Sequence, residues 1–319
     1  MKNKSAVLGY PDSDNLGDFI QSIAATKLMM PEKPLILNRD QLNNYYGPQV
    51  KLIMNGWFME QPENWPPSSS ITPLFISFHL NPTAESGMLT TKGILYFKKY
   101  QPIGCRDSYT QKTLEEHGIK TYFSGCLTLS LKRADFINVN QNREGVLVVS
   151  PFERLLHQRD TIKLNKPMSP LLKGIQKIKQ PFKMNKYKQA IKRLDAYLSQ
   201  LDEEVQFRTQ LSSPKIHTEE ERIKAAEEQL EAIASSKLVI TSRIHSALPA
   251  VAFGTPVLFL SDGLEHPNQK SRLEGMETFF RIITSRKLKS QGSDLPEPKK
   301  IPKAILNRFE KELRSFLKE

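Results

Sequence analysis

The chain has 319 residues and a formal net charge of +12, with 39% hydrophobic and 25% charged residues. This length favours two domains, each with its own core, and the composition is that of an ordinary globular protein. There is no run of about 18 apolar residues, as a membrane-spanning helix needs, and no apolar region of a signal peptide at the N-terminus. We therefore expect a cytoplasmic protein whose two cysteines, Cys105 and Cys126, stay reduced.

The N-terminal part of the chain alternates short apolar strands with helices, which predicts an α/β domain over residues 1–140. Strands are expected at Ala6–Gly9, Pro34–Leu37, Lys51–Asn55, Leu74–Phe78 and Thr121–Phe123. Helical spacing of apolar residues predicts helices over Asp18–Met30 and Tyr109–His117, and Gly118 ends the second. The segment Gln61–Pro73 is rich in Pro and Ser and is predicted to be a loop.

Polar residues follow several of these strands, and ligands of parallel α/β sheets bind at such strand ends. Asn15, Gly17 and Asp18 follow the first strand. Gly17 allows the backbone to approach a ligand closely. Asp18 has two interpretations: a substrate contact, or the N-cap of the helix, for which Asp is a preferred residue. Ser77 and His79 end another strand and are further candidates for substrate contacts.

Arg106 follows a short apolar segment just before the helix Tyr109–His117, and Asp107 or Ser108 is predicted to cap that helix. An arginine at a strand end is suited to clamp an anion, because its guanidinium group binds carboxylate and phosphate in bidentate fashion. Cys126 lies in a turn of small residues. As a nucleophile it would need an adjacent base, and packing in the core is the alternative interpretation.

The polar stretch Lys132–Gly145 predicts a linker, and a second α/β domain is expected over residues 141–319. A strand at Val146–Ser150 and helices over 187–201, 223–233 and 305–317 are predicted from the spacing of apolar residues. Thr218 and Glu221 form a capping-box pattern at the start of the second of these helices.

The segment 154–193 is predicted to be a basic insertion in this second domain. It holds twelve Lys and Arg and one acid, Asp160, a local balance of +11. Such a surplus favours an anionic partner, namely nucleic acid, an anionic lipid surface or a phosphorylated substrate; a solvated loop is the alternative. Few aromatic residues interleave with the charges and no nucleic-acid motif accompanies them, so no nucleic-acid partner is expected.

The most informative stretch is Ser235–Leu260, which predicts a βαβ unit and hence a parallel sheet. Its parts are the strand Leu238–Thr241, a turn with Ser242, a helix ended by Gly254, and the strand Val257–Leu260. Arg243 and His245 lie at the strand end, next to a helix N-terminus that favours anions. A fixed cation and a proton carrier thus meet where a phosphorylated or carboxylated substrate would bind. For His245, packing or capping is the alternative interpretation.

Taken in order, these motifs resemble those of the polysaccharide pyruvyl transferase family. The matching segments, over about residues 9–260, are NLGDFIQ, NGWF, WPPS, ISFHL, PIGCRDSYTQKTLEEHGIKTYFSGCLTLSL and VITSRIHSALPAVAFGTPVLFL. One departure stands out. In relatives the strand before the Glu-rich helix often ends in Thr-His, whereas here Thr209 is followed by Gln210 and the next histidine is His217.

The resemblance implies an α/β fold of two Rossmann-like domains facing a central cleft, similar to GT-B glycosyltransferases. It implies transfer of a pyruvyl group from phosphoenolpyruvate, the donor substrate, to two hydroxyls of a sugar, forming a ketal without a metal or other cofactor. The acceptor would be a cell-surface polysaccharide or its lipid-linked precursor. The site residues it implies are His245 and Arg243 for catalysis, and Arg106, Asn15, Gly17, Asp18, Ser77, His79 and Ser242 for substrate binding.

With a lipid-linked acceptor, the basic segment would contact an anionic membrane at its inner face. Two other functions remain open at this point. A GT-B-type glycosyltransferase would use a nucleotide-sugar donor in the same fold, and a non-enzymatic anion-binding protein would tolerate the loss of His245.

Overall fold

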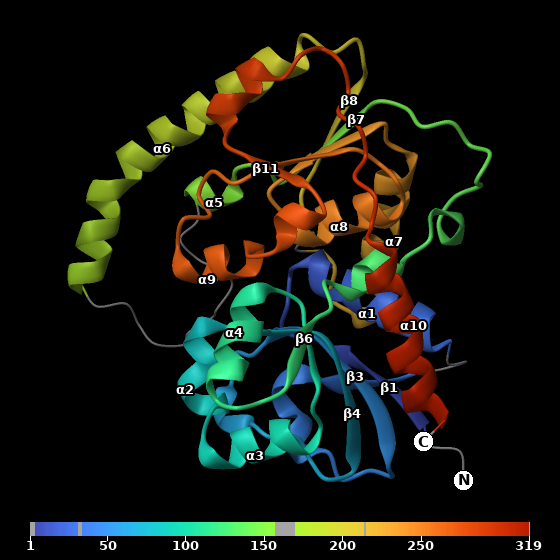
Figure 1. Ribbon diagram of the computed structural model, residues 1–319. Helices are drawn as coiled ribbons and strands as arrows, with labels where there is room; N and C mark the ends of the chain where they lie inside the picture. Colours follow the sequence, from blue (N-terminus) through green and yellow to red (C-terminus); the bar gives the residue numbers. More distant parts are fainter. Residues whose placement is uncertain (1–3, 31–33, 157–169, 214, 319) are drawn as a thin grey trace.

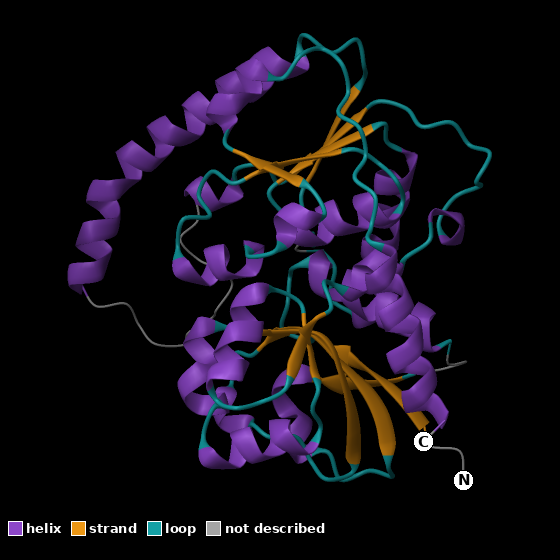
Figure 2. Cartoon of the chain, in the orientation of Figure 1, coloured by secondary structure: helices purple, strands orange, loops and turns teal. Residues whose placement is uncertain are grey.

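The computed structural model describes residues 4–30, 34–156, 170–213 and 215–318, which form two parallel β-sheets covered by helices (Figures 1 and 2). The first sheet has the strand order β2-β1-β3-β4-β5-β6, and the second β11-β10-β9-β7-β8. Every strand pair is parallel. The predicted fold class, α/β with two Rossmann-like halves, is therefore confirmed.

The first sheet is built from the N-terminal part of the chain. Its strands are β1 (Lys4–Gly9), β2 (Leu35–Asn38), β3 (Val50–Phe58), β4 (Ile71–Leu80), β5 (Ile103–Cys105) and β6 (Thr121–Phe123). Its helices are α1 (Leu16–Met29), α2 (Glu85–Met88), α3 (Thr91–Lys99) and α4 (Ser108–Glu116). The predicted strands are found, but β4 begins at Ile71, inside the segment expected to be a loop.

The second sheet follows after a loop. Its strands are β7 (Val146–Val149), β8 (Val205–Arg208), β9 (Leu238–Thr241), β10 (Val257–Leu260) and β11 (Arg281–Ile283). The helices are α5 (Glu153–Leu156), α6 (Pro170–Leu198), α7 (Glu219–Ser235), α8 (Ile244–Ala252), α9 (Pro267–Lys270) and α10 (Lys303–Lys318). The predicted βαβ unit β9-α8-β10 is confirmed, and Thr218 and Glu221 form the predicted capping box at α7.

Continuous apolar runs explain the central strands of the second sheet. All residues of β7, β9 and β10 are buried, as expected for strands with helices on both faces. Helix α1 contacts both α7 and α8, so helices that follow strands of different sheets pack on each other. This contact brings the carboxyl ends of β1 and β9 together.

The C-terminal helix α10 packs on the first sheet, although the sequence places it in the predicted second domain, 141–319. It contacts β4, and Lys51 of β3 donates a hydrogen bond of 2.6 Å from Nζ to the carbonyl oxygen of Phe316. Figure 1 shows α10 beside β3 and β4. The C-terminal end of the chain therefore packs on the N-terminal sheet. The predicted division into two domains at residue 140 stays a prediction.

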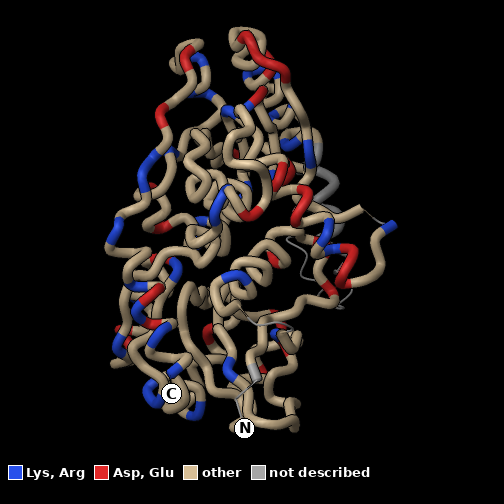
Figure 3. Tube along the Cα trace, turned by 90° about the vertical axis from the view of Figure 1, so that its right-hand side faces the viewer, with Lys and Arg blue, Asp and Glu red and all other residues tan. Residues whose placement is uncertain are grey.

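Helix α6 extends along the outside of the second sheet (Figure 1). It carries the later part of the basic segment 154–193, and residues 157–169 of that segment lie outside the described residues. Elsewhere acidic and basic positions are interspersed along the chain (Figure 3). Within the described ranges, no helix is both long and apolar enough to cross a bilayer.

Candidate functional site

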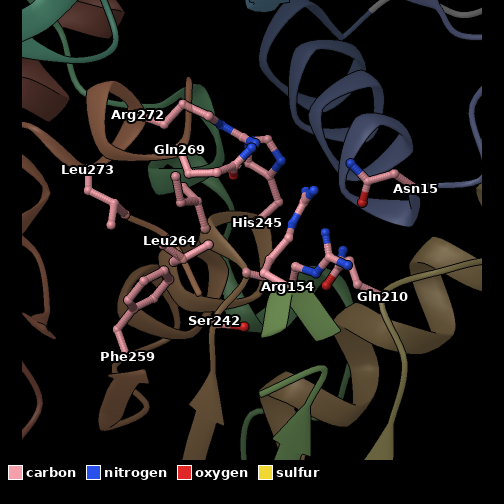
Figure 4. Close-up of a pocket in the computed structure, with 12 residues that line it drawn as sticks. Asn15, Arg154, Gln210, Ser242, His245, Phe259, Leu264, Gln269, Arg272 and Leu273 are labelled. Carbon is pink, nitrogen blue, oxygen red and sulfur yellow. The ribbon is translucent and has the colours of Figure 1, made fainter. Parts of the chain in front are cut away.

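A pocket lies where the strand ends of the second sheet face the start of α1 (Figure 4). The space between its walls is about 380 Å³, part of it open to solvent. Its walls are formed by Asn15, Arg154, Gln210, Ser242, Arg243, Ile244, His245, Phe259, Leu264, Gln269, Arg272 and Leu273. Three of these described lining residues are arginines and none is acidic, so we call it the arginine pocket.

His245 stands in the first turn of α8 and is 4% exposed. Its imidazole lies against Gly17 in the first turn of α1: a Cβ atom placed on Gly17 would be 2.8 Å from Nδ1 of His245. Only a residue without a side chain allows this approach. The predicted close approach at Gly17 is thus made to the imidazole.

The protonation of His245 is set by burial and by neighbouring cations. Burial is the main reason why the pKa of His245 lies well below its usual range, and the charges of Arg106 and Arg272 lower it further. Its Nε2 has no hydrogen-bond partner among the described residues. The imidazole is therefore neutral near pH 7. An anion bound beside it would raise the pKa and allow it to carry a proton.

Arg243 is the N-cap residue of α8, and its guanidinium group forms an ion pair with Glu153 of α5. The Glu153 carboxylate also accepts hydrogen bonds from Ser150 Oγ and, at 2.9 Å, from Thr209 Oγ1. Burial raises the pKa of Glu153, but Arg243 and these hydrogen bonds hold it below its usual range. Nε of Arg243 has no hydrogen-bond partner among the described residues, so an N–H group remains for a ligand.

Two further arginines, Arg154 and Arg272, extend into the same pocket, and Figure 4 shows their side chains converging with that of His245. Burial and the charge of Arg243 lower the pKa of Arg154 to about 9. Burial and the charge of Arg106 lower the pKa of Arg272 to about 10. Burial is the larger cause in both cases, and the neighbouring arginines add a repulsion that a multiply charged anion would offset.

Arg106 follows β5 and is 0% exposed, so it does not line the arginine pocket. None of its three guanidinium nitrogens has a hydrogen-bond partner among the described residues, and its Nε lies 3.5 Å from Oδ2 of Asp107. Its charge lowers the pKa of both His245 and Arg272. A buried guanidinium group with unpaired N–H groups is costly unless an anion or water satisfies it.

His79 is brought to Asp107, with 2.6 Å between Nδ1 and Oδ2, and both side chains are fully buried. Asp107 also accepts a hydrogen bond from Thr110 N and thereby caps α4. Of the two residues predicted for this cap, Asp107 and Ser108, the structure therefore confirms Asp107. Burial lowers the pKa of His79 to about 4, although Asp107 acts in the opposite direction. The neutral ring donates Nδ1–H to Asp107, and Nε2 has no partner among the described residues.

Ser77 and Ser242 are both buried but differ in what their hydroxyls do. Ser77 has a left-handed backbone, with φ of 64°, and its N–H donates to Ser124 Oγ at 3.0 Å. Its own Oγ has no partner among the described residues. Ser242 lines the arginine pocket, yet its hydroxyl donates to the carbonyl oxygen of Ser150 at 2.7 Å. Ser242 therefore fixes the turn after β9.

The predicted N-cap role of Asp18 is wrong, because α1 begins at Leu16 and places Asp18 inside its first turn. Asn15 is the N-cap instead: its Oδ1 accepts a hydrogen bond of 3.2 Å from Gly17 N. Asp18 accepts a hydrogen bond of 2.6 Å from Ser13 Oγ. A carboxylate in the first turn is still favoured by the helix dipole.

A second pocket, of about 950 Å³, adjoins the first and shares Asn15, Arg154, Gln269 and Arg272 with it. Four carboxylates line this second pocket, and we call it the acidic pocket; they belong to Asp12, Asp18, Asp40 and Glu60. Asp18 lines only the acidic pocket, but its charge acts on Arg272, which both pockets share.

Sequence reasoning did not identify Arg154, Arg272, Gln210 and Gln269 as site residues. Arg154 belongs to the basic segment 154–193, for which the sequence predicts contact with a membrane. The position of Gln210 could have marked it as a site residue, since it occupies the strand end at which relatives often have histidine. It is 1% exposed, its carbonyl oxygen accepts a hydrogen bond of 2.9 Å from Leu16 N, and its side chain accepts one from Ser246. No sequence pattern marks Arg272.

In the searched, described part of the chain, no group of three or more His, Cys, Asp or Glu side chains is arranged to hold a metal ion. Cys126 is fully buried, and Thr128 Oγ1 donates to its Sγ at 3.3 Å. This environment agrees with the packing interpretation of Cys126.

A family model described as polysaccharide pyruvyl transferase matches residues 86–263, more than half of the chain. No curated protein matches the chain significantly. Among solved structures, a functionally uncharacterized protein from Klebsiella pneumoniae is 10% identical, with a TM-score of 0.48, covering 89% of this chain and 93% of that one. The wall teichoic acid polymerase TagF is 11% identical, with a TM-score of 0.38, covering 100% of this chain and 84% of that one. An alpha-glucosyltransferase in complex with UDP and DNA is 9% identical, with a TM-score of 0.32, covering 99% and 95%.

Proposed function

Because the chain belongs to the polysaccharide pyruvyl transferase family, we propose that it transfers a pyruvyl group from phosphoenolpyruvate to two hydroxyls of one sugar, forming a cyclic ketal. The sugar belongs to a cell-surface polysaccharide or to its lipid-linked precursor. The observation that carries this proposal is the convergence of Arg154, Arg243 and Arg272 on His245 in one pocket. These groups suit a donor that is strongly anionic and must be protonated to react.

The arginine pocket is suited to the charges of the donor. Phosphoenolpyruvate carries a phosphate and a carboxylate, and arginine binds both in bidentate geometry. Arg243 is positioned by Glu153. Arg154 and Arg272 lie beside further arginines, which lower their pKa values in addition to burial, and an anion would neutralise this positive charge. Arg106 extends the positive field from the buried side.

His245 is suited to carry the proton in the reaction. Protonation of the methylene carbon of phosphoenolpyruvate leaves a cationic C2, and one sugar hydroxyl adds to it. Phosphate then leaves with the electrons of the C2–O bond, and the second hydroxyl adds to close the ketal. Of the two hydroxyl protons, one replaces the proton given to the methylene carbon and the other leaves with phosphate. The bound anion would raise the pKa of His245, which is otherwise too low for a proton donor.

A lipid-linked acceptor would bring the protein to a membrane, and we assign this contact to helix α6. Phe182 and Met184 are 71% and 37% exposed, and lysines at positions 186 and 188 are exposed beside them. Exposed apolar side chains among lysines are typical of surfaces that bind anionic bilayers. A position at the inner face of the membrane would follow.

Release of inorganic phosphate tests the donor. The purified protein should bind phosphoenolpyruvate and, with a glycan acceptor, release phosphate from it in equimolar amounts with the ketal. Nucleotide sugars should give neither binding nor transfer. Transfer of a sugar from a nucleotide donor, with no use of phosphoenolpyruvate, would identify a glycosyltransferase instead.

A further inference from the structure

The acidic pocket is continuous with the arginine pocket but differs from it in charge. The two share Asn15, Arg154, Gln269 and Arg272, so a molecule in one is in reach of a molecule in the other. The acidic pocket spans about 950 Å³, part of it open to solvent, and is the larger of the two. Its position beside the arginine pocket makes it a candidate site for a second ligand.

Beyond the shared arginines, the acidic pocket is lined by four carboxylates, which accept hydrogen bonds, and by amide and hydroxyl side chains, which both donate and accept them. Its remaining cation, Arg39, is engaged: Nε donates to Oδ2 of Asp40 at 3.0 Å, and the guanidinium carbon lies 4.9 Å from the centre of the Trp57 ring. The carboxylates of Asp12, Asp18 and Glu60 add three further negative charges. An anionic donor is therefore less favoured here than in the arginine pocket, where none of the described lining residues is acidic, whereas a neutral ligand with several O–H groups finds partners.

Aromatic side chains complete the chemistry. Trp57 is half-buried and lines the pocket together with Tyr10. An aromatic surface beside carboxylate and amide groups is suited to a ring with an apolar C–H face and a polar hydroxyl rim. This combination of side chains suits a sugar better than a nucleotide, because the phosphates of a nucleotide would lie near the carboxylates of Asp12, Asp40 and Glu60.

We propose that the acidic pocket is the acceptor subsite, in which the sugar contacts Trp57, hydrogen-bonds to Glu60, and turns its two reacting hydroxyls toward the junction at Asn15 and Arg272. The proposal rests on the proposed function for the identity of the donor beyond that junction. Asp18 lines the acidic pocket, and its charge acts on Arg272 at the junction. It is placed to accept a proton from a reacting hydroxyl.

Sugar binding tests the subsite without turnover. The probes are methyl β-D-galactopyranoside, methyl β-D-glucopyranoside and the methyl glycoside of N-acetyl-β-D-mannosamine, titrated by saturation-transfer NMR without donor. At least one probe should bind the wild type. Trp57→Ala and Glu60→Ala should each weaken its binding roughly tenfold, as expected for loss of an aromatic contact or a charged hydrogen bond.

The matched control is Tyr46→Ala, which removes an aromatic side chain that is 88% exposed and outside both pockets. Sugar binding should be unchanged in this variant and in Arg243→Ala. If Trp57→Ala does not fold, Glu60→Ala decides, because the Glu60 side chain is exposed. Wild-type binding that survives both substitutions, or no binding of any probe, overturns the subsite.

Calorimetry with phosphoenolpyruvate separates this inference from the proposed function. If the protein binds phosphoenolpyruvate but its sugar binding does not depend on Trp57 or Glu60, the proposed function stands and the acceptor subsite is refuted. If sugar binding depends on these residues but the protein does not bind phosphoenolpyruvate, the acceptor subsite stands and the proposed function is refuted.

Discussion

Gly17 packs directly against the imidazole of His245, and this contact joins the first turn of α1 to the first turn of α8. Because each helix follows a strand of a different sheet, the position of His245 depends on how the two halves of the chain meet. The imidazole that we propose as the proton carrier is therefore held where the helices of the two sheets meet.

Gly17→Ala should displace the imidazole, since the new Cβ would lie 2.8 Å from Nδ1. We expect turnover to fall roughly 100-fold, as displacements of about 1 Å at reacting groups do. Steady-state kinetics and a thermal melt measure the two effects. The control is Gly292→Ala, where the nearest atom would be 3.9 Å away and both quantities should be unchanged. Normal turnover in Gly17→Ala would show that this contact does not position His245.

Arg243→Ala should weaken phosphoenolpyruvate binding by about ten- to a hundredfold, because a charged hydrogen bond contributes about 1.5–3 kcal/mol. Arg106→Ala should weaken it less, because Arg106 is fully buried outside the arginine pocket and acts on the donor through its charge alone. Isothermal calorimetry measures the affinity. Arg314→Ala is the control, since its side chain is 76% exposed on α10. Unchanged affinity in both Arg243→Ala and Arg106→Ala would refute the assignment of these arginines to the donor.

Stability should fall as the pH falls from about 6.5 to about 4, because folding holds His79 neutral. The pKa of His79 is lowered to about 4 in the folded protein, so over this window the unfolded chain binds the proton and the folded protein does not. The loss is at most about 1.4 kcal/mol per pH unit for one group. Denaturant unfolding at several pH values should show a shallower slope for His79→Gln. His245, whose pKa is also lowered, leaves part of the slope in place. An identical slope in both proteins would contradict the neutral state of His79.

Binding to vesicles that contain anionic lipid should depend on α6 and weaken as salt rises. A variant that combines Phe182→Ser with Lys186→Glu should co-sediment much less than the wild type. Lys311→Glu, a charge-matched change at an exposed position of α10, should have little effect. Equal binding to vesicles of neutral lipid would return the basic segment to the solvated-loop interpretation.

Local sequence patterns predicted the α/β class, most strands and the βαβ unit around Arg243 and His245, because buried parallel strands and helix ends leave clear signals. Other features required the tertiary structure. Strand β11 has only three residues, and Arg272 lies in a single 3-10 turn, Ser271–Leu273, so neither stands out. The start of α1 was misplaced, because Asn15 and Asp18 are both good caps and only the backbone decides between them.

The pairing of side chains across the two sheets was equally out of reach of the sequence. Gly17 was expected to bring the backbone close to a ligand, and the structure shows that it also makes room for His245. His79 was expected among substrate contacts and is paired with Asp107 under full burial. Each outcome depends on which strand ends face each other, and no local pattern encodes this.

His245→Gln should lower turnover roughly 10²–10⁴-fold while folding and donor binding are retained, since general acid–base catalysis contributes about that much. Single-turnover kinetics and calorimetry on the same preparation separate the two effects. Near-normal turnover in a folded variant would make His245 a structural residue, and the proton would then have to come from another group, such as His79, Asp18 or Asp107.

The most direct test follows the carbon that becomes the ketal. The protein is incubated with phosphoenolpyruvate labelled with ¹³C at C2 and with lipid-linked saccharides or surface polysaccharide as acceptor, and the products are examined by NMR. We predict that the label appears in a quaternary ketal carbon bonded to two sugar oxygens, together with one equivalent of phosphate, in the wild type and far more slowly in His245→Gln. Label that remains in phosphoenolpyruvate, or is released as free pyruvate with every acceptor, would contradict the account.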